Sequence, residues 1–316
     1  MSNSIFISRF ASDLDGFIIY RCNLGYKRTT YECPLKRLDR FLSELFPNDS
    51  ILTKDIVLTW IEKLSTSENA RIIRLFAEYL TNIGKEAFIL KSNFVGTKPR
   101  KLPYIFSDDE LNRLFLSIDT VALSKSSPIE KYAYPVMFRL IYTCGLRPME
   151  ARTLKREHIH ENTGEIFVEN SKDNRDRIVI MSDNMNTYIK QYLSVWELHH
   201  GENPYLFPYH DNHLSIHQVR NFFKICWKNA NPNIPISNLP KVRVYDLRHR
   251  FATENIMRWT EQNVNISTML PYLKTYMGHA NLNDTAYYIH LMPERISAYT
   301  DAQWCELTNL IPEVKI

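Results

Sequence analysis

The stretch Tyr272-Leu-Lys-Thr-Tyr-Met-Gly-His-Ala-Asn-Leu-Asn-Asp-Thr-Ala-Tyr-Tyr-Ile-His290 sets a glycine–histidine pair nine residues ahead of a tyrosine pair. This spacing indicates Tyr288 as a candidate nucleophile. A phenol attacks poorly at its ordinary pKa of about 10, so a reactive tyrosine needs neighbours that remove its proton and stabilise the developing charge. The rest of the chain is therefore expected to supply cations.

Two arginines and a lysine meet this requirement. Arg147 lies in the run Gly-Leu-Arg-Pro-Met-Glu and Arg248 in the run Tyr-Asp-Leu-Arg-His-Arg, each within a longer apolar segment. Lys172 lies between two β-branched and aromatic segments, residues 165–169 and 177–181, which predict a hairpin. Each residue alone is compatible with an ordinary solvated charge, so the evidence for a functional role comes from their order along the chain.

In chain order the boxes are Gly-Leu-Arg, a hairpin lysine, Leu-Arg-His, Gly-His and Tyr-x-His. Over residues 104–291 this order resembles the tyrosine site-specific recombinases of the phage integrase family, while the N-terminal part matches only in length and pattern. The resemblance implies a mainly α-helical fold with a small β-hairpin or sheet (α+β), in which a helical core-binding domain precedes the catalytic domain. It also implies cleavage and rejoining of double-stranded DNA through a covalent 3′-phosphotyrosine, with neither metal nor cofactor.

The resemblance assigns the phosphate to the two arginines. Arg147 and Arg248 would bind its non-bridging oxygens, because guanidinium groups are planar, multidentate and charged at any working pH. Lys172 would protonate the departing 5′ oxygen, as the hairpin lysine does in the family. Glu150, three residues after Arg147, matches the acidic residue that supports the site, although a simple helix salt bridge explains it equally well.

The attacking side includes both tyrosines of the pair. The family spacing from Gly-His selects Tyr288, and Tyr287 would then face another side of its helix. His279 and His249 would hydrogen-bond the phosphate or carry the proton of Tyr288, with a structural role as the alternative for His249. The family usually has histidine where this chain has Tyr245, and a neutral phenol cannot exchange protons near neutral pH as imidazole does. Tyr245 is expected in the site, and the general base is left open.

Composition sets the broad class. The 316 residues are enough for two domains, and 44% of them are hydrophobic. No run of about 18 apolar residues predicts a membrane span, and the start has no signal-peptide pattern, so we expect a cytoplasmic, nucleoid-associated protein. The five cysteines are scattered without a C-x-x-C pair, which predicts neither a disulfide framework nor a zinc site. The sequence also has no P-loop pattern and no carboxylate cluster for magnesium.

Charge and periodicity divide the chain. Residues 1–100 hold 15 Lys and Arg against 11 Asp and Glu, which accounts for the whole net charge of +4. This bias favours phosphate binding, although a solvated surface can carry the same surplus. Four amphipathic stripes predict a helical core-binding domain over residues 1–96, followed by a basic, proline-containing linker over 97–104 and a catalytic domain over 105–316. DNA contacts are expected from Arg71, Arg74, Lys98, Arg100 and Lys101.

The tail, residues 292–316, is too rich in apolar residues for a free end. The resemblance implies that it docks on a neighbouring protomer in a DNA-bound homo-tetramer, which accessory DNA-bending proteins can join. Packing of the tail within its own chain is the alternative.

The leading interpretation is a recombinase that integrates or excises a mobile genetic element by transposition or a related reaction. A chromosome-dimer resolvase-like enzyme and a type IB topoisomerase-like enzyme keep the same chemistry with a different task. A catalytically silent DNA-binding regulator keeps only the fold. Formation of a covalent protein–DNA adduct separates the enzymes from the regulator.

Overall fold

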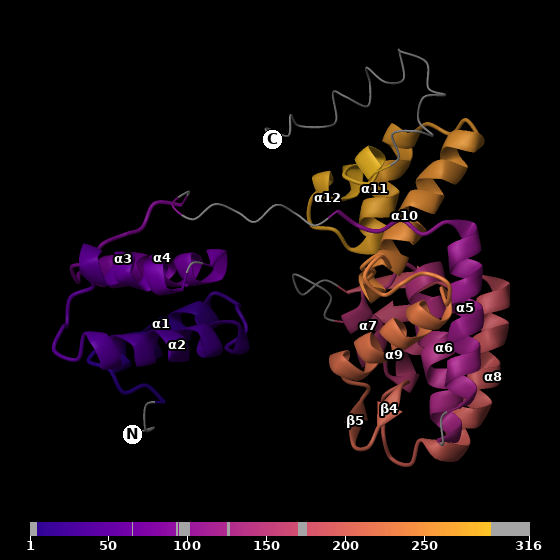
Figure 1. The fold of residues 1–316 in the computed structure, drawn as a ribbon, viewed down its shortest axis with the longest axis horizontal. Helices are drawn as coiled ribbons and strands as arrows, with labels where there is room; N and C mark the ends of the chain where they lie inside the picture. Colours follow the sequence, from indigo (N-terminus) through magenta and orange to yellow (C-terminus); the bar gives the residue numbers. More distant parts are fainter. Residues whose placement is uncertain are drawn as a thin grey trace. The chain divides into compact units, whose positions relative to one another are not determined.

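A computed structural model describes residues 5–64, 66–92, 94, 102–124, 127–169 and 176–291. The chain divides into two compact units, Met1–Lys101 and Leu102–Ile316, which are mostly helical with small antiparallel sheets (Figure 1). The predicted fold class is confirmed. Within the described ranges, no helix combines the length and apolarity that crossing a membrane requires.

Four helices form the first unit. They are α1 (Ala11–Asn23), α2 (Thr29–Leu45), α3 (Lys54–Lys63) and α4 (Ser67–Asn82). Each buries one apolar stripe, and Phe17 of α1 lies edge-on to Phe76 of α4 in the shared core. The first helix begins at Ala11, and ahead of it Asp39 of α2 accepts hydrogen bonds from the backbone N–H groups of Ile7 and Ser8.

The second unit is built around α6. Its long helices are α5 (Asp108–Leu123), α6 (Pro128–Thr143), α8 (Asp183–His199), α9 (Ile216–Asn229) and α10 (Val244–Glu261). Helix α6 packs against α5, α8 and α10, and its apolar side chains are almost completely buried. The sequence around Phe138 and Ile141 predicts a helix with Pro135 in its first turn, but Pro128 occupies that turn and Pro135 lies inside the helix. The periodicity before Pro135 was too short to show the extra turns.

A three-stranded antiparallel sheet contains the predicted hairpin. The strands are β1 (Ile159–His160), β2 (Glu165–Val168) and β3 (Arg177–Ile180), in the order β1-β2-β3, with Val168 opposite Arg177. A second small hairpin pairs β4 (Pro208–Tyr209) with β5 (Asn212–His213). Two-residue strands give too little alternation to be seen in a sequence.

The last described elements complete the second unit. They are the short helices α7 (Pro148–Thr153) and α12 (Asn283–Ala286), the 3-10 turns η1 (Arg156–His158) and η2 (Ile289–Leu291), and α11 (Ile266–Met277). An apolar cluster that includes Ile256, Leu270, Met277 and Ile289 joins α10, α11 and η2. This cluster fixes the C-terminal end of α11 next to α10. The chain that follows α11 leads to Tyr288.

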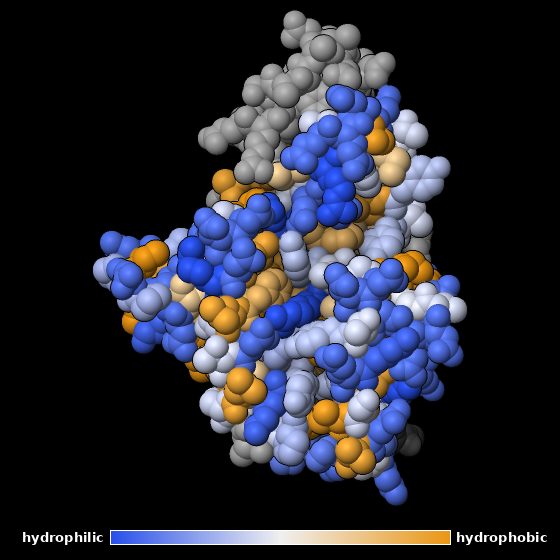
Figure 2. Space-filling view, turned by 90° about the vertical axis from the view of Figure 1, so that its right-hand side faces the viewer, coloured by the Kyte–Doolittle hydropathy of each residue, from blue (hydrophilic) through white to orange (hydrophobic). Residues whose placement is uncertain are grey.

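The surface of the second unit gives little hint of its chemistry. Figure 2 shows a largely hydrophilic face interrupted by separate hydrophobic areas. The most exposed leucines of α5 and α8 are Leu116, Leu123 and Leu198. Isolated exposed leucines are normal on soluble proteins, so the candidate site has to be built from buried polar groups.

Candidate active site

Arg147 is held between the end of α6 and the start of α7. Gly145 ends α6 with a φ of +62°, and a Cβ there would lie 2.5 Å from the ring of Phe251 on α10. Only glycine permits both the left-handed backbone and this close approach. Pro148 then starts α7, a position where proline's missing N–H is no loss. The sequence Gly-Leu-Arg-Pro therefore turns Arg147 inward against α10 and α11.

Glu150 binds two arginines at once. One carboxylate oxygen accepts from Nη1 of Arg147 at 2.6 Å and Nη1 of Arg177 at 2.9 Å. The other accepts from the backbone N–H of Arg147 at 2.8 Å and Nη2 of Arg177 at 2.7 Å. Burial alone would raise the pKa of Glu150. The hydrogen bonds and positive charges of Arg177 and Arg147 outweigh burial and lower the pKa to about 2. This carboxylate is ionised at any working pH.

Arg248 lies on α10 and has no exposed surface. Its Nη1 donates to the carbonyl of Gly145, and its Nη2 donates to the carbonyl of Met277 and lies 3.1 Å from Nε2 of His279. Burial lowers the pKa of this guanidinium. Its Nε is buried and finds no acceptor in the part of the chain that the structure describes, so one donor is left for a ligand.

Three arginines meet the C-terminal end of α11. Arg177 donates to the carbonyl of Tyr276 at 2.8 Å, Arg248 to that of Met277 at 2.5 Å, and Arg147 to that of Gly278 at 2.5 Å. The last carbonyls of a helix have no intrahelical partner and carry partial negative charge. Three consecutive carbonyls thus satisfy donors from α7, α10 and β3. The Gly-His box is the point at which these elements are joined.

Tyr288 lies inside this arrangement with 2% of its surface exposed. Its hydroxyl is 3.1 Å from Nδ1 of His249. Burial raises the pKa of Tyr288, and the charges of Arg248 and Arg147 oppose that rise. Tyr287, by contrast, is only half-buried. Of the two tyrosines, Tyr288 is the one surrounded by the cationic cluster, and it is protonated in this state.

Both histidines are held in the neutral form. Burial, together with the charges of Arg248 and other arginines, lowers the pKa of His279 to about 3. Burial is also the main cause that lowers the pKa of His249 to about 4. Nδ1 of His279 contacts the Thr285 hydroxyl at 2.8 Å, which leaves Nε2 toward Arg248. A neutral imidazole can accept a proton, and the hydroxyl of Tyr288 is a candidate proton donor to His249.

Tyr245 is half-buried one helical turn before His249, and their rings are 4.9 Å apart. The structure thus brings seven of the expected residues into one region of the second unit: Arg147, Glu150, Tyr245, Arg248, His249, His279 and Tyr288. It adds Arg177, which the sequence analysis treated only as the start of a strand. The signal available in the sequence was an arginine at the first position of a strand otherwise made of isoleucine and valine.

Several expected residues are elsewhere. Lys172, Lys98, Arg100, Lys101 and the tail lie outside the described residues. Arg71 and Arg74 lie on α4 in the first unit, where Arg71 is exposed near the Tyr31 ring and Arg74 is 3.7 Å from Glu78. Their proposed contact with DNA stays a prediction.

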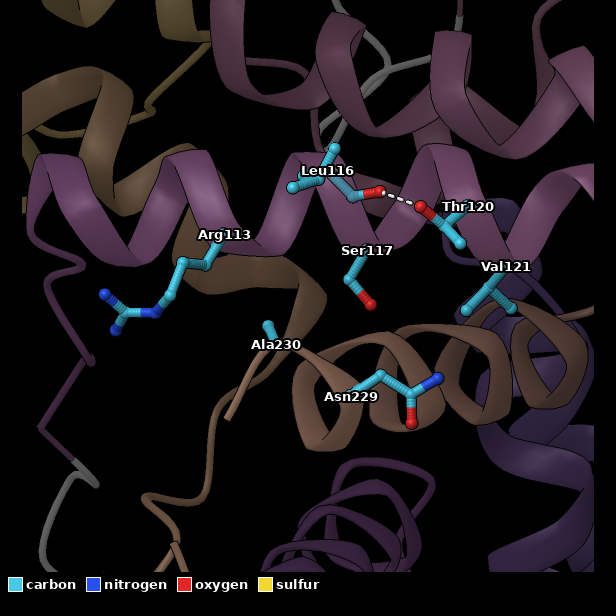
Figure 3. A pocket seen from close by; sticks show the side chains of 7 residues that line it. All are labelled: Arg113, Leu116, Ser117, Thr120, Val121, Asn229 and Ala230. Carbon is cyan, nitrogen blue, oxygen red and sulfur yellow. Dashed lines mark hydrogen bonds between the residues drawn. The ribbon is translucent and has the colours of Figure 1, made fainter. Parts of the chain in front are cut away.

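Two of the pockets among the described residues lie in the second unit. One of about 920 Å³ adjoins Arg177 and is lined by apolar and aromatic side chains of β3, α10 and α11, including Ile178, Trp259 and Tyr272. The other, of about 330 Å³, lies between α5 and α9 beside Arg113 and Asn229 (Figure 3). None of the seven expected site residues lines either pocket.

Residues 105–295 match the model of the phage integrase family. The chain belongs to this family. A putative integrase/recombinase of Sinorhizobium fredii, y4rB, is 26% identical over 302 residues, covering 91% of this chain and 95% of the relative. A tyrosine recombinase of Rhizobium meliloti, XerD, is 24% identical over 200 residues, covering 63% of this chain and 60% of the relative.

Solved structures of recombinases share the fold. A post-cleavage complex of the XerH site-specific recombinase with its difH substrate aligns with a TM-score of 0.63 at 19% identity, covering 85% of this chain and 78% of that one. The Tn1549 transposon integrase with circular intermediate DNA aligns with a TM-score of 0.63 at 18% identity, covering 95% and 98%. Family membership supports a recombinase enzyme, and the arrangement of residues provides the basis for assigning roles.

Proposed function

We propose that this chain is a DNA recombinase that cleaves and rejoins strands through a covalent 3′-phosphotyrosine at Tyr288. The observation that carries the proposal is the position of the buried Tyr288 hydroxyl. It contacts a neutral histidine, and it lies close enough to Arg248 and Arg147 for their positive charges to act on its pKa. Phosphoryl transfer depends mainly on positioning and on neutralising the phosphate oxygens. A phenol, a proton acceptor and two guanidinium groups supply these requirements.

In the cleavage step, the Tyr288 oxygen attacks phosphorus as its proton passes to His249. His249 suits this role because it already contacts the hydroxyl at 3.1 Å and is neutral. The bond from phosphorus to the 5′ oxygen breaks, and Lys172 donates the proton that this oxygen needs. The products are a 3′-phosphotyrosine and a free 5′ hydroxyl.

Arg147, Arg248 and His279 stabilise the pentacovalent transition state. The Nε of Arg248, which has no acceptor among the described residues, is a donor available for a phosphate oxygen, while its Nη2 orients His279. Tyr245 adds one neutral hydrogen bond to the phosphate. In this proposal His249 takes the task that the family's usual histidine at position 245 would share, and its contact with the Tyr288 hydroxyl supports this choice of general base.

The same residues reverse the reaction. A 5′ hydroxyl from another strand attacks phosphorus and gives its proton to Lys172, the bond from phosphorus to the Tyr288 oxygen breaks, and His249 returns the proton to Tyr288. The covalent bond preserves the energy of the broken phosphodiester, so strand exchange requires no high-energy cofactor. We assign the task to a mobile element, since the putative integrase/recombinase y4rB aligns over nearly the whole chain and the transposon integrase shares its fold.

Nicked suicide duplexes carrying the DNA that flanks the gene test this proposal. The expected product is protein attached to a 3′ phosphate, formed in the presence of EDTA and lost in Tyr288→Phe. DNA binding without an adduct on any duplex would favour the silent regulator. Relaxation of a supercoiled plasmid without exchange between two sites would favour the topoisomerase-like enzyme.

The proposal includes a DNA-bound homo-tetramer joined by residues 292–316. The apolar pocket beside β3 is an acceptor of suitable character for a hydrophobic segment. Deletion of residues 294–316 should preserve folding and single-site binding and abolish synapsis, as measured by light scattering of protein–DNA complexes. Loss of monomer stability on deletion would instead indicate packing within the same chain.

A further inference from the structure

Arg177 is the most completely bound cation of the cluster. It opens β3, its side chain is 8% exposed, and both of its terminal nitrogens donate to Glu150 while Nε donates to the carbonyl of Tyr276. Such a bidentate pair is strong and geometrically specific. Because all three kinds of donor nitrogen are engaged, Arg177 has little capacity to bind a phosphate itself.

Glu150 is shared unequally among three positive charges. Arg177 and Arg147 each contact it below 3 Å, and Nη1 of Arg248 lies 3.8 Å away. The four side chains together carry a net charge of +2. Without Arg177 the same carboxylate would be matched against Arg147 and Arg248 alone, and the net charge facing the phosphate would fall to +1. In a buried site of low dielectric, a loss of one charge at this distance is felt strongly.

We infer that Arg177 is a positioning residue that holds Glu150 on one side, so that Arg147 keeps positive charge available for the scissile phosphate. This inference rests on the proposed strand-cleavage function. Arg177 acts through Glu150, which in turn fixes both the backbone N–H and the guanidinium of Arg147. If Arg177 is absent, Glu150 competes with the phosphate for Arg147.

A purely structural role makes a different prediction. Arg177 also packs against Gly278, where a Cβ would lie 3.1 Å from its Nη1, and it joins β3 to the end of α11. If joining these elements were its whole task, its removal would harm folding and cleavage together, whatever the charge at position 150. The charge of Glu150 is therefore the variable that separates the two roles.

The test is a double-mutant cycle in the full chain, with Arg177→Met, Glu150→Gln and the double variant. Single-turnover cleavage of the suicide duplex should fall about a hundredfold for Arg177→Met, the usual loss for one charge-stabilising group. In the Glu150→Gln background the same change should cost less than about tenfold, because no negative charge then competes for Arg147. Arg177→Lys should recover part of the loss.

Arg139→Met is the matched control. It removes another bidentate arginine–carboxylate pair of the same unit, with Asp119, whose members lie on α6 and α5 and not in the cluster. Its cleavage rate should stay near that of the unmodified chain. Equal losses from Arg177→Met in both backgrounds, with a parallel fall in the melting temperature, would overturn the inference.

A second readout uses DNA with a methylphosphonate at the scissile position. This group has one non-bridging oxygen fewer and no charge, so it makes less demand on Arg147, and the loss caused by Arg177→Met should shrink on it. An undiminished loss would count against the inference. Failure of the unmodified chain to form any adduct refutes the proposed function instead, whereas an active unmodified chain with a fully active Arg177→Met variant refutes only the role of Arg177.

Discussion

The arginine side and the tyrosine side of the candidate site are built differently. On the arginine side, Arg147, Arg177 and Arg248 are fixed by Glu150 and by backbone carbonyls at the ends of α6 and α11. On the tyrosine side, the hydroxyl of Tyr288 contacts His249, and the side chain packs among apolar residues of α10, α11 and η2. Under the proposed function, the cations that would bind the phosphate are fixed before DNA arrives, whereas the hydroxyl of Tyr288 is buried and protonated.

The largest effect is expected on the tyrosine side. Tyr288→Phe removes the attacking oxygen, so the covalent adduct should fall below detection while DNA binding persists. Tyr287→Phe, at a half-buried neighbour, should preserve both. Denaturing gel analysis of the suicide duplex reaction measures the adduct. Loss of the adduct in Tyr287→Phe alone would shift the nucleophile by one residue and break the comparison.

Substitution of Lys172 tests whether the residue that protonates the leaving 5′ oxygen belongs to neither the arginine side nor the tyrosine side. Lys172→Ala should slow cleavage by about 10²- to 10⁴-fold, the usual contribution of a general acid. A 5′-bridging phosphorothiolate should restore the rate, because a thiolate departs without a proton. Single-turnover kinetics on the two substrates gives the answer, and a variant that the sulfur substrate does not rescue would remove Lys172 from this role.

On the arginine side, Arg248→Lys should be nearly as harmful as Arg248→Ala. Lysine cannot span Gly145, Met277 and a phosphate oxygen together, so cleavage should fall about 10²- to 10³-fold. DNA affinity, measured by fluorescence anisotropy, should change much less, since the arginine acts mainly in the transition state. A lysine variant that cleaves normally would show that charge suffices and that the fixed geometry is dispensable.

Tyr245 lies at the boundary between the two sides. Tyr245→Phe should reduce cleavage by the value of one hydrogen bond to a charged group, about 1.5 to 3 kcal/mol. Tyr245→His should be tolerated and should introduce a new ionisation in the pH–rate profile between about pH 5 and 8. A fully active Tyr245→Phe variant, with no new ionisation in Tyr245→His, would reduce this residue to packing.

The smallest effect concerns stability. His249 and His279 have folded-state pKa values of about 4 and about 3, below the ordinary value of 6.5. Between the ordinary pKa and these lower values, the unfolded chain binds more protons than the folded chain. The free energy of unfolding is therefore unaffected above about pH 6.5 and decreases as the pH falls toward 4. Thermal melts of the unmodified chain and His279→Gln should show a flatter acid dependence in the variant. Identical slopes would contradict the buried neutral state.

The sequence predicted which residues belong to the candidate site better than it predicted the contacts between them. The short boxes around Arg147, Arg248 and His279 could be predicted because their order along the chain resembles that of the family. The paired state of Glu150 could not, since its second partner Arg177 is 27 residues away and meets it only through the sheet. Helices with clear stripes were found within a few residues. The start of α6 was missed because a buried helix lacks a polar face.

The proximity of His249 to Tyr288 was also hidden. The two residues are 39 positions apart, and nothing in a periodic pattern indicates which ring nitrogen faces a hydroxyl. The tertiary packing of α10 against η2 determines that contact. The sequence left His249, His279 and water as routes for the Tyr288 proton, and the contact of 3.1 Å is the reason why the proposal chooses His249.

The burial of Tyr288 has a consequence for timing. A hydroxyl on a side chain that is 2% exposed cannot touch a phosphate that stays in bulk solvent. If Tyr288 is the nucleophile, as proposed, its hydroxyl has to become exposed before it attacks, and each tenfold drop in the population of the exposed state costs about 1.4 kcal/mol of apparent DNA affinity. Under this proposal, DNA that stabilises the exposed state is cleaved in preference to DNA that does not.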